Sequence, residues 1–172
     1  MDESHDEWGT VYNSTLARIR ASPDKTKLLI ELKQQNGMDD HTYMVKTILD
    51  AFLRAGIATM NVDHVRWAGK QRSLQLDYGN VRVDFNVVFD GTEILLEIKT
   101  HDTVLADRTR EQLATLTRYK KHIGLVVPEE MMRKADYMVK LNRLFPDVRI
   151  VAYEELVENP EEELGRIAGR RA

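Results

Sequence analysis

The dipeptide Asp90-Gly91 is the feature of this chain that most limits how it can fold. It stands between two runs, residues 81–89 and 92–99, in which apolar residues largely alternate with polar ones. A period of two is typical of β-strands. Asp-Gly is a strong signal for a two-residue type I′ turn, because both central residues of that turn need a positive φ. The sequence therefore predicts a tight β-hairpin.

A two-residue loop also predicts which residues face each other across the hairpin. Counting back from the turn gives these cross-strand pairs: Phe89–Thr92, Asp84–Glu97, Val83–Ile98 and Arg82–Lys99. On this register the charged side chains share one face of the hairpin and the apolar side chains share the other.

The predicted pair of Asp84 and Glu97 points to a bound cation. Like charges directly opposite each other destabilise a sheet by up to about 1 kcal/mol, so two facing carboxylates favour a positive ion between them. A hard divalent ion such as Mg²⁺ suits them, since it binds through one or two carboxylates and leaves the rest of its shell to water and phosphate oxygens. Lys99 lies on the same face and could hold a phosphate or a nucleophilic water. The competing interpretation is a solvated strand face.

Asp84, a gap of twelve residues and then Glu97-Ile98-Lys99 resemble the motif of the PD-(D/E)XK nuclease superfamily, which includes restriction endonucleases, Holliday-junction resolvases and recombination exonucleases. The resemblance covers about residues 42–152. It implies an α/β (α+β) fold with a restriction-endonuclease-like core, in which helices flank a central mixed sheet. It also implies Mg²⁺ or Mn²⁺ held by Asp84, Glu97 and the backbone carbonyl of Ile98, with Lys99 assisting attack by water.

The chain departs from the family pattern at two places. Val83 occupies the position of the family's proline, and the family's additional helix glutamate would fall near Met44 or His41, neither of which is an acid. Asp40 and Asp50 on the same predicted helix are the candidates for that additional acid.

The order of the remaining elements agrees with such a core. Helices are predicted over 9–20, 22–36 and from 39 or 40 to 56, followed by strands over 62–67 and 73–78 that join the hairpin in a four-stranded antiparallel meander. After Lys99 the sequence predicts a helix over 104–121, a strand over 123–127, a helix over 129–145 and a strand over 148–152. Strand, helix, strand is a crossover connection. We expect one domain, with an N-terminal helical extension (1–41), the core (42–152) and an acidic C-terminal tail (153–172).

Basic side chains near the motif are candidates for contacts with nucleic-acid phosphates. They are Arg82, Arg108, Arg110 and Arg118. Arg82 could instead pair with a nearby carboxylate, an interpretation that we favour slightly. Gln112 lies on the helix after the motif, where many relatives carry a functional glutamine or lysine, although an exposed glutamine without a catalytic role is the more common case.

The composition excludes several classes of protein. A net charge of −3 argues against a protein that coats nucleic acid nonspecifically. There is no apolar run of transmembrane length, no signal peptide and no lipidation motif, so we expect no membrane partner. The absence of cysteine fits an intracellular, cytoplasmic protein.

The sequence thus predicts a divalent-metal-dependent nuclease, most simply an endonuclease that acts on DNA. Cleavage of both strands of a duplex needs two sites, which a homodimer would provide. The alternative is a catalytically inactive module of the same fold that binds nucleic acid or a protein partner. A third, weaker alternative is a small α/β protein whose termini serve protein partners.

Overall fold

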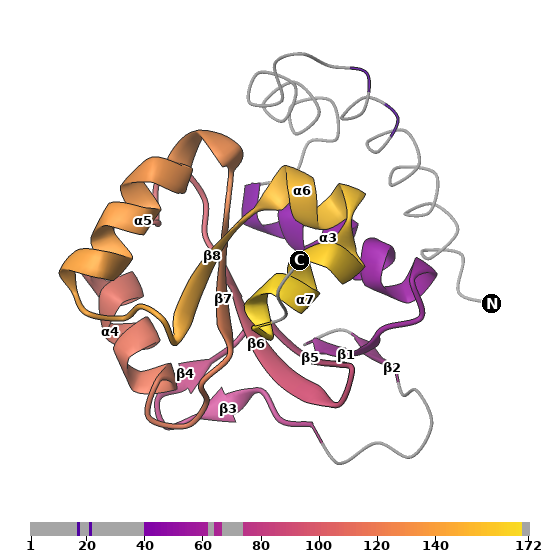
Figure 1. The fold of residues 1–172 in the computed structure, drawn as a ribbon, viewed down its shortest axis with the longest axis horizontal. Helices are drawn as coiled ribbons and strands as arrows, with labels where there is room; N and C mark the ends of the chain where they lie inside the picture. Colours follow the sequence, from indigo (N-terminus) through magenta and orange to yellow (C-terminus); the bar gives the residue numbers. More distant parts are fainter. Residues whose placement is uncertain (1–16, 18–20, 22–39, 62–63, 67–73, 170–172) are drawn as a thin grey trace.

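The computed structural model describes residues 17, 21, 40–61, 64–66 and 74–169. The helices predicted over 9–20 and 22–36 lie outside the described residues, except for residue 17. The elements in chain order (Figure 1) are α3 (Asp40–Arg54), β1 (Ala58–Asn61), β2 (His64–Arg66), β3 (Asp77–Tyr78), β4 (Val81–Arg82), β5 (Phe85–Phe89), β6 (Thr92–Ile98), α4 (Asp107–Leu116), β7 (Ile123–Val127), the 3-10 helix η1 (Glu129–Met131), α5 (Met132–Leu141), β8 (Val148–Ala152), α6 (Tyr153–Glu158) and α7 (Pro160–Ile167).

Six of the described strands form one mixed sheet in the order β2-β1-β5-β6-β7-β8, and β3 pairs with β4 in a separate ladder. Neighbours from β2 to β6 are antiparallel, whereas β6, β7 and β8 are parallel. The parallel pairs are connected through α4 and α5, because parallel strands need a crossover connection. The protein is therefore α/β, with a mixed central sheet flanked by helices, as the sequence predicts.

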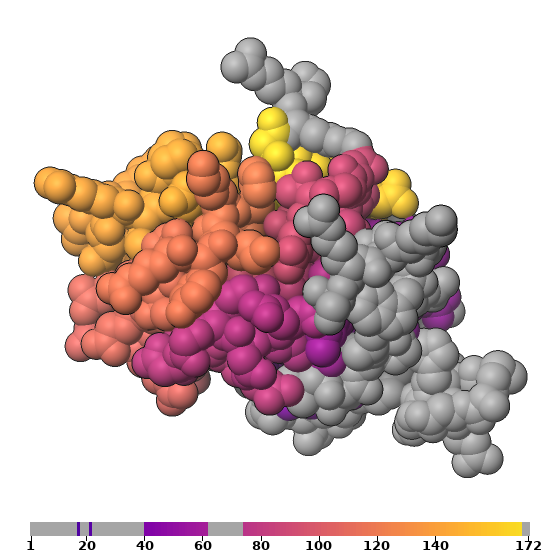
Figure 2. Space-filling view, turned by 90° about the horizontal axis from the view of Figure 1, so that it is seen from below, coloured from indigo at the N-terminus to yellow at the C-terminus, as the bar shows by residue number. Residues whose placement is uncertain are grey.

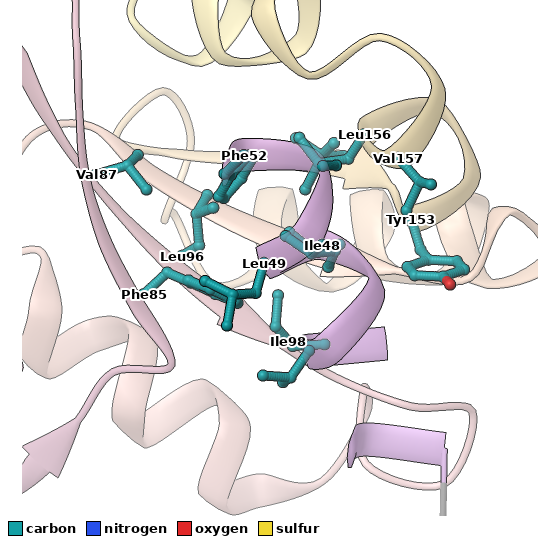
Figure 3. Close-up of a cluster of buried hydrophobic side chains, with 14 of the residues drawn as sticks. Ile48, Leu49, Phe52, Phe85, Val87, Leu96, Ile98, Tyr153, Leu156 and Val157 are labelled. Atoms are coloured by element: carbon teal, nitrogen blue, oxygen red, sulfur yellow. The ribbon is translucent and has the colours of Figure 1, made fainter. Parts of the chain in front are cut away.

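Helices cover both faces of this sheet (Figure 1): α3, α6 and α7 lie on one face and α4 and α5 on the other. Figure 3 shows the first core, where the rings of Phe52 and Phe85 meet edge to face at 5.6 Å. The second core includes Leu95, Leu113 and Val139. A sheet buried on both faces explains why β7 is an uninterrupted apolar run.

The Asp90-Gly91 turn forms as predicted. Asp90 has φ 49° and Gly91 has φ 76°, the positive values that the turn requires. The β5–β6 register runs from Phe89 opposite Thr92 to Phe85 opposite Leu96, in agreement with the count from the turn.

Strand pairing ends sooner than the sequence predicts, and the predicted pair of Val83 with Ile98 is wrong. The N–H of Val83 donates to the carbonyl of Leu76 at 2.9 Å, and Val83 packs in the second core, whereas Phe85 packs in the first. The chain bends at Asp84. The physical reason is that the Ile98 N–H donates to Oδ2 of Asp84 at 2.8 Å and not to a backbone carbonyl of the neighbouring strand.

The predicted four-stranded meander and the pair of Arg82 with Lys99 are also wrong. The β3–β4 ladder places Arg82 opposite Asp77. This ladder lies against α4 (Figure 2), and the ring of Tyr78 lies 5.6 Å from that of Tyr119, three residues beyond the end of α4. The outer neighbour of β5 is β1, which follows α3 directly.

The helices that frame the hairpin begin and end close to the predicted residues. α3 starts at Asp40, and Gly56, with φ 70°, follows its end. α4 is shorter than predicted because residues 101–105 form turns, in which Oγ1 of Thr103 accepts the N–H of Thr100 at 2.9 Å. The helix predicted over 129–145 is η1 followed by α5.

The segment predicted as an acidic tail contains α6, which packs on α3, and α7, which packs on α6 and β5. Tyr153, Leu156 and Leu164 are buried in the first core, and the hydroxyls of Tyr153 and Thr47 lie 2.6 Å apart. Glu154 is 1% exposed and accepts the N–H of Glu129 at 2.9 Å. In the described part of the chain, every helix is too short or too polar to span a membrane.

Candidate active site

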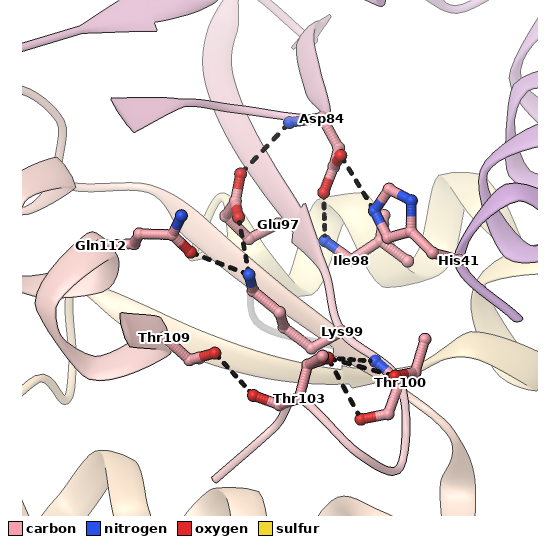
Figure 4. Close-up of polar contacts among 9 residues, drawn as sticks. All are labelled: His41, Asp84, Glu97, Ile98, Lys99, Thr100, Thr103, Thr109 and Gln112. Carbon is pink, nitrogen blue, oxygen red and sulfur yellow. Dashed lines mark hydrogen bonds and ion pairs between the residues drawn. The ribbon is translucent and has the colours of Figure 1, made fainter. Parts of the chain in front are cut away.

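The bend at Asp84 brings its carboxylate next to that of Glu97 at the carboxyl end of β6 (Figure 4). The N–H of Asp84 donates to Oε1 of Glu97 at 3.2 Å, while the Asp84 carboxylate accepts the Ile98 N–H. The two acids predicted to be a pair are therefore close in space. They are held by crossed hydrogen bonds from backbone to side chain rather than by strand pairing.

Glu97 is buried, with 3% of its surface exposed, because helices cover its face of the sheet. Burial and the neighbouring charge of Asp84 raise the pKa of Glu97 from 4.5 to about 7, and the charge of Lys99 acts in the opposite direction. Ionisation of Glu97 is thus disfavoured in the folded protein, and an additional cation nearby would stabilise its charged form. The competing interpretation of a solvated strand face therefore does not hold for Glu97.

Lys99 lies between the acid pair and α4. Its Nζ donates to Oε1 of Gln112 at 2.8 Å and lies 3.6 Å from Oε2 of Glu97, and its side chain is 16% exposed. Gln112 is therefore more than a surface residue, since it fixes the position of the ammonium group.

His41 joins the site from the opposite layer, in the first turn of α3. Its Nε2 lies 3.1 Å from Oδ1 of Asp84 (Figure 4), and this hydrogen bond raises the pKa of His41 above 6.5, while partial burial opposes the rise. His41 is not among the site residues that the sequence predicts. The signal was present, because His41 is one of the two positions where the family's helix glutamate was expected.

A pocket of about 410 Å³ opens beside these groups, and we call it the site pocket. Its lining consists of Asp40, His41, Ile98, Lys99, Thr100, Asp102 and Thr103. Lys99 and His41 reach the pocket directly, whereas Glu97 lies buried behind Lys99. A substrate phosphate in this pocket would therefore meet Lys99 and His41, together with the carboxylates of Asp40 and Asp102.

The two candidate additional acids lie in different places. Asp40 lines the site pocket, beside His41. Asp50 is buried in α3 about 15 Å further along the helix, at a rise of about 1.5 Å per residue, and is not among the pocket residues.

The predicted phosphate-binding arginines do not gather at the pocket. Arg108 is exposed on α4, one turn before Gln112 and on a similar side of the helix. Arg110 is paired with Asp107, and Arg118 lies beyond the end of α4. Arg82 is exposed and lies 3.9 Å from Asp77, which agrees with the favoured interpretation that it pairs with a carboxylate.

The donor atoms at the site fit a hard divalent cation. Asp84, Glu97 and the Ile98 carbonyl offer oxygen, the ligand type of Mg²⁺, which binds proteins through few carboxylates and keeps much of its water. Glu97 is buried beside Asp84, and this raises its pKa. A cation bound between the two acids would offset that unfavourable effect. Among the described residues, no group of three or more His, Asp or Glu side chains could hold a metal by itself. Backbone, water or substrate oxygens would thus complete the shell.

The site therefore combines two neighbouring acids, a lysine held by a glutamine and a histidine on a carboxylate. Of these groups, Lys99 and His41 line the site pocket. This combination can bind a cation and a phosphate side by side. No family model matches the chain, and no match was found among curated proteins or among solved structures.

Proposed function

We propose that this protein is a divalent-metal-dependent nuclease of the PD-(D/E)XK type that hydrolyses phosphodiester bonds in DNA. The observation that carries the proposal is the contact of Asp84 with Glu97, with Lys99 fixed beside them at the wall of the site pocket. Two acids and a lysine at this spacing are the elements of that family's motif. A restriction-endonuclease-like core is part of the same proposal.

Asp84, Glu97 and the Ile98 carbonyl would hold Mg²⁺ or Mn²⁺. When bound, the metal would polarise a phosphate oxygen and lower the pKa of a bound water toward neutrality. The desolvation that raises the pKa of Glu97 supports this assignment, because a cation removes the penalty of burying its charge.

The other side chains would act on the substrate and the water. Lys99 would orient the attacking water or offset charge on the phosphate, and Gln112 would keep the lysine in position. Arg108, exposed one turn before Gln112, would contact a flanking phosphate. His41 would orient the Asp84 carboxylate.

The test measures cleavage of plasmid and oligonucleotide DNA with Mg²⁺ or Mn²⁺, with EDTA as the blank. Asp84→Asn, Glu97→Gln and Lys99→Ala should each abolish cleavage while circular dichroism stays unchanged. Glu93→Gln and Lys120→Ala are matched controls, because these two residues form an ion pair at 2.9 Å outside the site pocket. Cleavage that persists in all three site variants would refute the proposal.

A second candidate is a noncatalytic module that binds nucleic acid. The observation in its favour is that His41 occupies Oδ1 of Asp84 while the Ile98 N–H occupies Oδ2, so both carboxylate oxygens already have partners. Calorimetric titration with Mg²⁺ and Mn²⁺ separates the two candidates. Nucleic-acid binding without metal binding or cleavage would favour the module.

A further inference from the structure

A second hollow lies between α4 and α5, the α4–α5 groove, and its surface is largely apolar. Its volume is about 700 Å³, larger than the site pocket. Leu105, Tyr137 and Leu141 line it with 50%, 69% and 66% of their surfaces exposed. Large apolar side chains gathered on an exposed surface are typical of binding sites.

The rim of the groove is basic. Arg133 and Lys134 are exposed on α5 one turn before Tyr137 and Met138, so they share a side of the helix with the apolar lining. Arg110 stands on the opposite wall, paired with the acid Asp107. Cationic groups around an aromatic and aliphatic floor complement a ligand that has both negative charge and flat apolar faces.

One short segment of the chain links the lining of the groove to the lining of the site pocket. Asp102 and Thr103 line the site pocket, and Leu105, two residues later, lines the groove. Hydrogen bonds hold this connection in place, because Oγ1 of Thr109 donates to the carbonyl of Thr103 at 2.6 Å (Figure 4). A nucleic-acid strand that follows residues 102–105 out of the site pocket would reach the groove.

We propose that the α4–α5 groove holds unpaired bases of the strand that is cut, so that the substrate is single-stranded or carries a single-stranded tail. This inference rests on the proposed function. Bases that are free of a duplex stack on aromatic side chains while basic residues follow the phosphates. A duplex hides its base faces and would leave Tyr137 and Leu141 unused, which is why the apolar floor selects unpaired bases.

The test is fluorescence anisotropy in EDTA, where no cleavage can occur, with labelled oligothymidine and with a blunt duplex of equal length. Tyr137→Ala should weaken binding of the single strand about tenfold, as expected for the loss of one stacking contact, and leave duplex binding unchanged. Tyr137→Phe should bind like the wild type because the ring remains. Tyr119→Ala is the matched control, since Tyr119 is 52% exposed and lies outside the groove lining.

The outcomes separate this inference from the proposed function. Metal-dependent cleavage together with unchanged single-strand binding in Tyr137→Ala would contradict the proposed role of the groove and still support the proposed nuclease activity. The tenfold loss without cleavage by the wild type would support the groove as a binding surface and refute the nuclease. If Tyr137→Ala weakened the binding of both probes equally, the inference would be overturned and the groove would have a general role in binding nucleic acid. If Tyr137→Ala changed sedimentation but not binding, the inference would also be overturned, and the groove would be a protein–protein contact.

Discussion

The backbone N–H of Asp84 donates a hydrogen bond to Oε1 of Glu97 at 3.2 Å, from a bend in the chain to the carboxyl end of β6. Together with the bond from the Ile98 N–H to the Asp84 carboxylate, it fixes two acids side by side where the pairing of β5 with β6 has ended. One of them, Glu97, is almost fully buried, so its charge state is linked to folding and would also be linked to the binding of a cation.

Stability without metal should fall as pH rises between 4.5 and about 7. The folded protein raises the pKa of Glu97 to about 7, so in this window the unfolded chain has released a proton that the folded chain still holds. The full cost above pH 7 is about 3 kcal/mol at about 1.4 kcal/mol per pH unit, as an order of magnitude. Denaturant unfolding in EDTA across this pH range measures it.

Glu97→Gln is the control for this pH dependence. The amide keeps an oxygen for the Asp84 N–H but does not titrate, so the fall assigned to Glu97 should disappear. If the stability of the wild type and of the variant changed with pH in the same way, Glu97 would not be the source of the pH dependence.

His41→Ala should lower stability in EDTA and should respond more strongly than the wild type to Mg²⁺. Below pH 6.5 His41 is protonated in both states, and its contact with Asp84 is fully stabilising; this contribution is lost as pH rises through the raised pKa of His41. For a half-exposed pair we expect about 1 kcal/mol, or about 2–4 °C in Tm. Mg²⁺ would restore much of this loss by taking over the positive charge beside Asp84.

His101→Ala is the matched control for His41→Ala. His101 lies 2.9 Å from Glu130, an equivalent histidine–carboxylate contact away from the acid pair. Its loss of stability should be the same with and without Mg²⁺. An equal Mg²⁺ response in both variants would contradict a cation site at Asp84.

Gln112→Ala should reduce cleavage about tenfold, less than Lys99→Ala. The lysine would lose its 2.8 Å bond to Gln112 and keep Glu97 at 3.6 Å, so it would be less well oriented but still present. Single-turnover cleavage rates compare the variants, with Gln75→Ala as the control at an exposed glutamine. A loss as large as that of Lys99→Ala would indicate that Gln112 contacts the substrate itself.

Gly91→Ala should destabilise the protein by about 1 kcal/mol. Gly91 has φ 76°, and nothing lies within 4 Å of an added Cβ, so the cost is purely that of the left-handed backbone. Thermal unfolding should show a decrease of about 2–4 °C. Asp90→Asn should be nearly neutral, because asparagine tolerates positive φ as well as aspartate does. Equal losses for the two variants would argue that side-chain contacts, rather than φ, stabilise the turn.

Local patterns in the sequence were sufficient for much of the fold. The Asp90-Gly91 turn and the alternation beside it predicted the β5–β6 register, and the apolar runs predicted β7 and β8. These features depend on interactions between residues near in the chain or on burial of whole segments. That register also predicted that Asp84 and Glu97 are close together. It did not predict the hydrogen bond from the Asp84 N–H to the Glu97 side chain.

Only the tertiary structure decided how the site is assembled. The bend at Asp84 depends on Leu76 taking the N–H of Val83, and the position of His41 depends on how α3 packs across the sheet. Such partners are far apart in sequence. A period-two pattern also looks the same whether the strand continues to pair or its next backbone N–H donates to a side chain. The sequence alone therefore determined that two acids and a lysine share one hairpin. The packing of α3 and α4 on opposite faces of the sheet determined that these groups are buried, oriented and joined by a histidine.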